Sequence, residues 1–332
     1  YYEKLNYAIG ESHEPGSTFK LMTLVAAFED QVVDTTSVFD TQNGELTFYS
    51  KYKVRDSRKG GYGKIPITEI FERSSNTGMV QAIYDHYKKK PEQFVNRLMN
   101  MGLSEPLGLP IVGEGKPLIP HPDKKGWSGI SLPWMAYGYG VLLTPMQILT
   151  FYNAIANDGV MVKPRFIERT QDARGIMKRK SEVEIISASV CSKETIGKVK
   201  SLLKGVVEKP WGTAHNIYDP NFAIAGKTGT CQLDYNTEEI QYVASFVGYF
   251  PSDRPKYSCI VVVHRPNKEK GYFGSTAAAP VFQKIAHKLY SSIPVETKLS
   301  RERYLEITQR KMETSKGVVD AKVDVKKTQN KS

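Results

Sequence analysis

The chain contains 332 residues, of which 40% are apolar, 46 are Lys or Arg and 35 are Asp or Glu, giving a formal net charge of +11. This ordinary globular composition excludes a wholly disordered chain and a collagen-like repeat, and three Cys without a C-x-x-C spacing exclude a disulfide scaffold. No apolar run approaches the roughly 18 residues of a transmembrane helix. In the absence of an RNA-binding or helix-turn-helix signature, the positive charge predicts no nucleic-acid partner.

The first half of the chain is predicted to be mainly helical. Residues 19–28 are apolar at helical spacing after a Pro-Gly turn, so Ser17 is expected at or near a helix N-terminus. Residues 31–66 are predicted to form a loop-rich segment with short strand-like runs. Residues 77–101 return to a helical pattern that a proline interrupts, and residues 103–133 are predicted to be irregular.

The second half is predicted to contain an antiparallel sheet between helices. Thr144-Pro145-Met146-Gln147 is a capping-box pattern that opens a helix running to a Gly stop at Gly159, and residues 194–207 form an amphipathic helix. A helix over residues 277–289 is expected to cover one face of the sheet. The three strand-like runs of this sheet are residues 222–231, 242–250 and 257–264.

The sequence favours Ser/Lys chemistry over the common alternatives. It holds no G-x-S-x-G elbow, H-E-x-x-H pair, Walker sequence or G-x-G-x-x-G loop, and its six His are scattered, which argues against a His-based serine hydrolase and a metal site. Three stretches fit S-x-x-K, beginning at Ser17, Ser50 and Ser201. Ser50 lies in a Lys-rich loop and Ser201 in the middle of a helix, so we assign both to surface or packing roles.

Ser17 differs from the other two because it follows a turn and opens an apolar helix. The i, i+3 spacing places Lys20 on its face, and the helix dipole favours negative charge at this end. This placement suits a serine nucleophile that must become an alkoxide. If the S-x-x-K match at Ser17 stood alone, the alternative would be that Ser17 is an ordinary N-cap residue of the helix.

Two further motifs follow along the chain. Ser74-Ser75-Asn76 is the only S-x-N and lies just before a predicted helix, so a cap or turn is its alternative role. Lys227-Thr228-Gly229-Thr230 contains the only K-[ST]-G, on a strand-like run where Gly229 is expected to let a ligand backbone approach closely. An exposed turn is its alternative role. The order and spacing of the three motifs make a chance match improbable.

At these residues the sequence resembles the penicillin-binding proteins, specifically the transpeptidase domain of the class B, division-specific (septal) type. The resemblance covers roughly residues 1–290 and includes segments beside the motifs. These segments are Glu14–Thr18, Gly138–Gly140 with Thr144, Pro145 and Gln147, Ala225–Gly226, Tyr272–Gly274 and Ala279–Phe282.

The resemblance implies a role for each motif residue. Ser17 attacks the penultimate D-alanine of a stem peptide ending in D-Ala-D-Ala, and Lys20 is the base, its pKa lowered by burial and by the nearby cation of Lys227. Ser74 relays a proton to the leaving amine, and Asn76 binds the substrate's amide.

The resemblance also implies how the substrate is held. Thr228 and Thr230, which flank Gly229, bind the terminal carboxylate near Lys227, and the backbone N–H groups of Ser17 and Thr230 form the oxyanion hole. An amine from a second stem peptide then completes the crosslink. β-Lactams are expected to acylate Ser17, and no metal or organic cofactor is implied.

The implied fold is α+β, of the serine β-lactamase and D,D-transpeptidase type. It has a central antiparallel sheet flanked by helices, a largely helical lobe from about residue 30 to 160, and an active-site groove between the sheet edge and this lobe. We expect the transpeptidase domain at residues 1–290 and a basic, mostly disordered or loosely helical tail at residues 291–332.

The location and partners are expected from the resemblance alone. The chain begins at Tyr1 rather than Met, so we expect a fragment of a longer protein. Class B members carry a membrane helix and a pedestal domain ahead of the catalytic domain, which implies inner-membrane anchorage with the catalytic domain in the periplasm. A septal glycosyltransferase and other division proteins are the implied partners.

Three rival functions share the Ser/Lys layout. A serine β-lactamase needs a carboxylate that positions water, and Glu92 with Asn96 fits the class A E-x-x-x-N, but this pair lies only 18 residues beyond Ser74 on a predicted helix. A D,D-carboxypeptidase differs only in using water in place of the amine. A non-catalytic β-lactam sensor would be acylated without turnover. The intact motifs and septal-type segments favour the transpeptidase.

Overall fold

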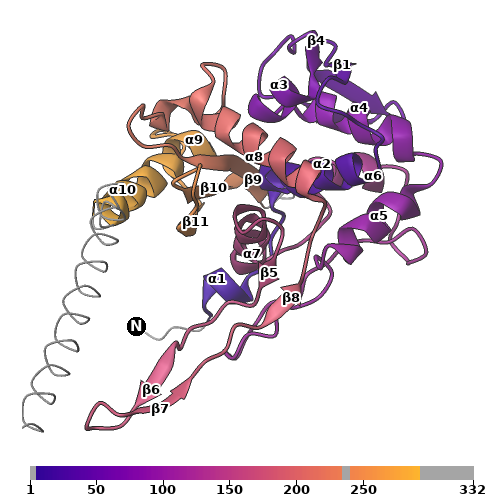
Figure 1. Cartoon of the computed structure of the whole chain (residues 1–332). Coiled ribbons are helices and arrows are strands. Elements are labelled where there is room, and N and C mark those ends of the chain that lie inside the picture. Colours follow the sequence, from indigo (N-terminus) through magenta and orange to yellow (C-terminus); the bar gives the residue numbers. More distant parts are fainter. Residues whose placement is uncertain (1–4, 234–239, 292–332) are drawn as a thin grey trace, which may run out of the picture. The chain divides into compact units, whose positions relative to one another are not determined.

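A three-stranded antiparallel sheet lies at the centre of the larger of two units. The computed structural model describes residues 5–233 and 240–291, and the chain divides into Tyr1–Ala286 and His287–Ser332. The sheet order is β11-β10-β9, so β9 is an edge strand (Figure 1). The three strands are β9 (Ala225–Leu233), β10 (Gln241–Phe250) and β11 (Tyr257–His264). All three predicted strands are therefore confirmed, the first with a later start.

Helices pack on both faces of this sheet because β10 carries large apolar side chains on both sides. Phe246 and Phe250, four residues apart and therefore on one face, contact Phe282, with ring centroids 4.8 and 5.6 Å apart. Phe282 belongs to α10 (Ala279–Tyr290), and the short α9 (Gly274–Ala277) precedes it. The opposite face carries Val247 and Tyr249. The helices α7 (Pro145–Ala156) and α8 (Lys193–Glu208) pack against the sheet as well.

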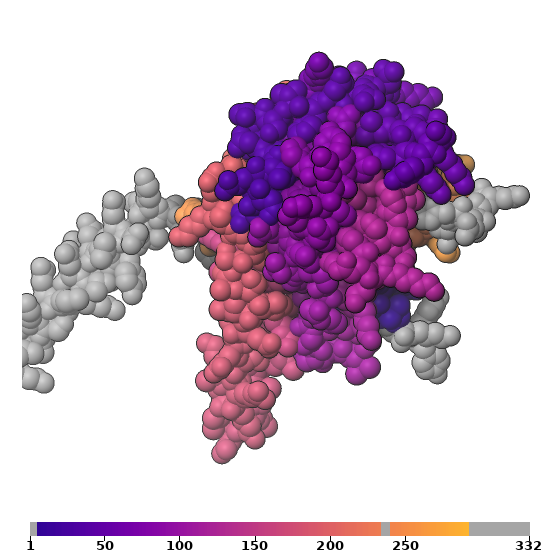
Figure 2. Space-filling view, turned by 90° about the vertical axis from the view of Figure 1, so that its right-hand side faces the viewer, coloured from indigo at the N-terminus to yellow at the C-terminus, as the bar shows by residue number. Residues whose placement is uncertain are grey.

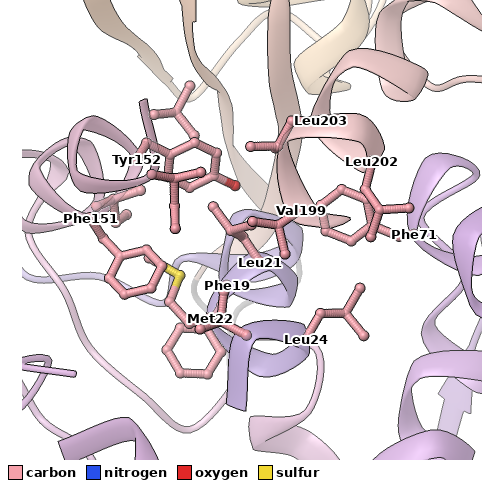
Figure 3. Packing of buried hydrophobic residues seen from close by; sticks show 14 of the residues in the cluster. Phe19, Leu21, Met22, Leu24, Phe71, Phe151, Tyr152, Val199, Leu202 and Leu203 are labelled. Carbon is pink, nitrogen blue, oxygen red and sulfur yellow. The ribbon is translucent and has the colours of Figure 1, made fainter. Parts of the chain in front are cut away.

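The helix α2 (Lys20–Glu29) lies inside the core. Every residue from Lys20 to Phe28 is buried, which is the pattern of a helix enclosed on all sides. Figure 3 shows its apolar side chains among those of three other helices. The labelled residues are Phe19 directly before α2, Leu21, Met22 and Leu24 on α2, Phe71 on α3 (Ile67–Glu72), Phe151 and Tyr152 on α7, and Val199, Leu202 and Leu203 on α8.

The stretch from residue 30 to 160 forms the expected helical lobe, with two small strand pairs inserted in it. The pair β1–β4 and the hairpin β2–β3 lie within the predicted loop-rich excursion, and the predicted proline break is the first residue of α5. The added elements are β1 (Val38–Asp40), β2 (Glu45–Phe48), β3 (Tyr52–Arg55), β4 (Lys64–Pro66), α4 (Asn76–Tyr87), α5 (Pro91–Asn100) and α6 (Ser131–Met135). The α+β class with a largely helical lobe is confirmed.

An arm between α7 and α8 was not anticipated from the sequence. Two strand pairs form it, β5 (Met161–Val162) with β8 (Ile185–Ser187), and β6 (Arg169–Gln171) with β7 (Met177–Lys180). The β6–β7 hairpin projects from the rest of the unit, drawn in pink (Figures 1 and 2). Its strand residues are exposed, so they lack the alternation of buried and polar positions that marks a strand in a sequence.

The predicted capping box at the start of α7 is present. The Thr144 hydroxyl accepts a hydrogen bond from Gln147 N at 3.2 Å, and the Gln147 side chain accepts one from Thr144 N at 2.8 Å. The helix ends at Ala156, three residues before the predicted stop, and Gly159 adopts a left-handed φ of 96° in the turn that follows.

Because Thr144 satisfies a backbone donor that is buried, Thr144→Ala should lower the free energy of unfolding by about 1 kcal/mol. Urea denaturation monitored by circular dichroism measures this change. Thr150→Ala, which removes a hydroxyl from the same helix without touching the cap, is the matched control and should cost less. Equal losses in the two variants would contradict a stabilising role for the cap.

Candidate active site

The first motif lies on a tight turn packed against the sheet edge. Ser17 belongs to the 3-10 turn η1 (Gly16–Phe19), and Lys20 is the first residue of α2, so the serine sits just before the helix rather than on it. Gly16 has a φ of 54°, and a Cβ there would lie 2.9 Å from the carbonyl oxygen of Thr230. Only glycine therefore lets this turn approach strand β9 so closely.

A second glycine, Gly138, contacts the same turn from a distant part of the sequence. Gly138 has a φ of 93°, and its carbonyl accepts a hydrogen bond from Gly16 N at 3.1 Å. A Cβ at Gly138 would collide with the Gly16 carbonyl. The backbones of these two segments, far apart in sequence, thus hold the nucleophile turn between them.

The second motif is joined to the first through the Lys20 ammonium group. Lys20 Nζ donates to Ser74 O at 2.7 Å, to Ser74 Oγ at 3.2 Å and to Asn76 Oδ1 at 2.6 Å. The side chain is 0% exposed, so these three oxygens replace its water shell. Lys20 therefore fixes the relative positions of the turn that carries Ser17 and the loop that carries Ser74.

Ser74 is placed by the way helix α3 ends. Its N–H bonds to Phe71 O, and the N–H of Ser75 bonds to Ile70 O, the paired hydrogen bonds of a Schellman motif. The residue at the bend of this motif adopts a left-handed conformation, and Ser74 has a φ of 59°. Glycine is the usual residue there, so this backbone conformation is strained for a serine. The serine hydroxyl, which glycine would lack, lies in the pocket wall.

The third motif lies on the edge strand β9. Lys227 is 0% exposed, and its Nζ donates to Thr228 O at 3.3 Å and lies 5.7 Å from the Phe71 ring centroid. The Thr228 hydroxyl lies 2.8 Å from that of Thr213, and Thr230 Oγ1 accepts from Gly274 N at 3.1 Å. The strand thus directs its two threonines outward while its lysine is enclosed.

Gly229 has a packing role that the sequence did not predict, and the expectation that it admits a ligand backbone stays a prediction. A Cβ at Gly229 would lie 2.3 Å from Ser245 Oγ and 2.8 Å from Thr18 Cγ2, so protein atoms occupy the space beside it. The glycine is required because the nucleophile turn packs directly against β9.

Five of the eight predicted site residues line one pocket of about 590 Å³. They are Ser17, Ser74, Asn76, Thr228 and Thr230. Lys20, Lys227 and Gly229 do not line the pocket, but Lys20 bonds to Ser74 and Asn76, and the other two flank Thr228 in the sequence. The rest of the wall consists of Tyr139, Tyr242, Tyr272 and Phe273, the polar or small residues Ser57, Thr213, Gln232, Gly274 and Ser275, and the charged residues Arg55, Asp56 and Arg73.

The two buried lysines have pKa values below that of a lysine in water. Burial lowers the pKa of Lys20 to about 7, and the negative charge of Asp56 opposes this shift. Burial, reinforced by the nearby Lys20, lowers the pKa of Lys227 well below its usual value. The expected depression of the Lys20 pKa by burial is thus present. The expected contribution of the Lys227 cation is wrong, because the repulsion between the two lysines lowers the pKa of Lys227 and not that of Lys20. At pH 7 an amine with a pKa of about 7 is neutral in about half of the molecules, and the neutral form can accept a proton.

Sequence analysis missed Asp56, which organises the second motif. Its carboxylate accepts hydrogen bonds from Asn76 N at 2.5 Å, Thr77 N at 3.0 Å, Thr77 Oγ1 at 2.8 Å and Ser75 Oγ at 2.9 Å. These contacts cover the N-terminus of α4, where negative charge is favoured. Asp56 is one of four acidic residues in the predicted loop-rich stretch of residues 31–66, and nothing around it signals this long-range contact.

The other candidate residues lie elsewhere. Ser50 is in the β2–β3 turn, Ser201 is exposed on α8, and Glu92 and Asn96 are on α5; none of them lines the pocket. Cys231, next to the third motif, is buried with 3% exposure. Among residues 5–233 and 240–291, no group of three His, Cys, Asp or Glu side chains is arranged to hold a metal ion, and no helix is long and apolar enough to cross a membrane. The predicted tail from residue 292 lies outside these ranges.

Solved structures confirm the fold. The transpeptidase domain of Burkholderia pseudomallei penicillin-binding protein 3 superposes with a TM-score of 0.72 at 27% identity, covering 87% of this chain and 82% of that one. Penicillin-binding protein 3 of Mycobacterium tuberculosis, in complex with aztreonam, gives a TM-score of 0.73 at 29% identity over 86% of this chain and 64% of that one.

Sequence comparison gives the same assignment. Stage V sporulation protein D of Bacillus subtilis is 29% identical over 280 residues, which are 83% of this chain and 42% of that protein. Peptidoglycan D,D-transpeptidase FtsI of Escherichia coli is 27% identical over 298 residues, 88% of this chain and 46% of that protein. The chain thus spans less than half the length of these relatives. The family model of the penicillin-binding protein transpeptidase domain matches residues 2–287, and the chain belongs to this family.

Proposed function

We propose that this chain is the catalytic part of a peptidoglycan D,D-transpeptidase that crosslinks stem peptides during septal cell-wall synthesis. The observation that carries the proposal is the Lys20 ammonium group, buried between the Ser17 turn and the Ser74 loop at the wall of a single pocket. Several relatives bear the name peptidoglycan D,D-transpeptidase FtsI, which supports the same reaction.

In the acylation step, Ser17 Oγ attacks the carbonyl carbon of the penultimate D-alanine. Lys20 in its neutral form takes the hydroxyl proton, and the backbone N–H groups of Ser17 and Thr230 stabilise the oxyanion. Collapse of the tetrahedral intermediate breaks the peptide bond, and the proton reaches the departing D-alanine amine through Ser74, whose hydroxyl lies 3.2 Å from Lys20 Nζ. The amine of a second stem peptide reverses these steps and forms the crosslink.

Asn76 is the proposed contact for the substrate's amide. Its Oδ1 accepts from Lys20, and its Nδ2 donates to Arg55 O at 2.7 Å, so the side chain is held in one orientation. A carboxamide has a second lone pair and a second N–H, and these remain to bind the peptide. Thr228 and Thr230 are the proposed donors to the terminal carboxylate.

The pocket disfavours the β-lactamase alternative. Asp56 is the single carboxylate among the described residues that line it, and four protein donors already bind its oxygens. It is therefore a poor base for activating a deacylating water. Glu92 and Asn96 are on α5 and do not line the pocket.

The cellular setting is proposed from the family. We expect anchorage in the cell membrane with this domain on the extracytoplasmic side, and association with a septal glycosyltransferase and other division proteins. The relatives named FtsI and penicillin-binding protein 3 support this setting.

Replacing the nucleophile tests the acylation step of the proposed reaction directly. The native chain incubated with benzylpenicillin should gain one adduct, visible by intact-protein mass spectrometry. The adduct should be stable for hours, because Asp56, the single carboxylate among the described residues that line the pocket, is already bound by four protein donors. Ser17→Ala should show no adduct. Ser201→Ala, the matched control in another S-x-x-K stretch, should acylate like the native chain.

Two results would contradict the proposal. Rapid return to the unmodified mass with consumption of the drug would identify a β-lactamase. Persistence of the adduct in Ser17→Ala would remove Ser17 from the mechanism.

The charge of Asp56 generates a pH prediction. Because Asp56 raises the pKa of Lys20, Asp56→Asn should lower it below about 7, and the acid limb of the acylation rate should move to lower pH. The maximum rate should also fall several-fold as the α4 cap weakens. Benzylpenicillin acylation rates between about pH 5 and about pH 9 measure both effects.

The control for this test is Ser75→Ala, which loses a hydrogen bond to Asp56 and the cap to Gly78 N but keeps the carboxylate charge. It should lower the rate without moving the acid limb. An acid limb that stays in place in Asp56→Asn, or moves to higher pH, would contradict the assigned electrostatic role.

A further inference from the structure

The third motif lacks an accessible positive charge for a carboxylate. Lys227 is fully buried, its Nζ faces Thr228 O and the Phe71 ring, and the side chain does not line the pocket. Burial also lowers its pKa well below the usual value. Thr228 and Thr230 can donate hydrogen bonds, but neutral hydroxyls bind a carboxylate more weakly than a cation does.

Arg73 supplies a cation in the pocket wall, and the surrounding side chains hold it in place. Its guanidinium carbon lies 5.5 Å from the Tyr62 ring centroid and 5.3 Å from that of Trp211. Its Nε donates to Glu69 at 2.9 Å, and the side chain is 23% exposed. Stacking on aromatic faces fixes the planar guanidinium, so less entropy is lost when it binds an anion.

The Nη groups of Arg73 remain for a ligand. Within the described part of the chain, the guanidinium of Arg73 makes its hydrogen bond to protein through Nε alone. A guanidinium whose Nε is occupied still presents four N–H donors on its two Nη atoms. Trp211 is itself held by its Nε1–H, which donates to Glu72 at 2.6 Å, so the aromatic support is also anchored.

A short path connects this arginine to the third motif. Trp211 is followed two residues later by Thr213, whose N–H bonds to Glu72 O, the carbonyl next to Arg73. The Thr213 hydroxyl lies 2.8 Å from the Thr228 hydroxyl. Arg73, Thr213 and Thr228 all line the pocket that contains Ser17. Thr213 thus contacts both Thr228 and the residue that precedes Arg73.

We propose that Arg73, clamped between Tyr62 and Trp211, is the cationic partner of the carboxylate on the donor peptide or β-lactam, acting with Thr213 and Thr228. The carboxylate thereby anchors the leaving-group end of the substrate, which aligns the carbonyl with Ser17. Arg73 is a carboxylate-binding residue and takes no part in proton transfer. This inference rests on the proposed function and specifies how that site selects an acidic substrate.

The test compares benzylpenicillin with its methyl ester, which differs by the loss of the charge. Second-order acylation rate constants are measured for the native chain, Arg73→Gln, Arg73→Lys and Arg58→Gln. Arg58 also stacks on Tyr62, at 5.5 Å, but does not line the pocket, so Arg58→Gln is a matched charge control. The native chain should favour the acid over the ester, and Arg73→Gln should reduce this preference by about ten- to a hundred-fold.

The expected pattern separates binding from folding. In Arg73→Gln the acid should react more slowly while the ester rate stays within a few-fold, Arg73→Lys should keep part of the preference, and Arg58→Gln should match the native chain. Equal slowing of acid and ester would show that Arg73 only supports the fold, and an unchanged preference would overturn the proposal. Failure of the native chain to react with either compound would instead refute the proposed function, and this inference with it.

Discussion

The burial of one lysine ammonium group is the interaction on which this site depends. Lys20 Nζ donates hydrogen bonds to three oxygens of the Ser74–Asn76 loop in place of water. The same residue is the first of helix α2, which lies inside the core. Removing a charge from water opposes protonation, and the pKa shift from the usual 10.5 to about 7 corresponds to a few kcal/mol. The unfolded chain therefore holds more protons than the native one between about pH 7 and 10.5, and this group makes the fold more stable as the pH rises through that window.

The rest of the fold provides the enclosure that this burial requires. Gly16 and Gly229 let the Ser17 turn pack against β9, and Gly138 lets a third segment close over the turn. Apolar side chains from three helices surround the start of α2 (Figure 3). Asp56 contributes in the opposite sense, since its charge limits the depression of the Lys20 pKa while its hydrogen bonds fix the loop. The chemistry thus follows from packing as much as from the three motifs.

The sequence was sufficient to predict features that depend on local patterns. The three motifs, the three strands and the Thr144 capping box are each encoded by residues close together in the chain. Long-range contacts were not predictable in this way. Asp56 binds the N-terminus of a helix that begins 20 residues later, and Arg73 packs against the aromatic rings of two distant residues, Tyr62 and Trp211. The packing constraint on Gly229 was not predicted because it comes from Thr18, which the sequence does not place beside it. The exposed β6–β7 hairpin lacks a buried face and therefore gave no strand signal.

Direct titration of Lys20 tests the central claim most closely. The chain would carry 13Cε-labelled lysine, the Lys20 resonance would be assigned by its loss in Lys20→Arg, and its chemical shift would be followed by NMR from about pH 5 to about pH 11. Burial among the Ser74 and Asn76 oxygens predicts a midpoint near 7. A midpoint near 10.5, the value of a lysine in water, would show that Lys20 is protonated at neutral pH and cannot be the base.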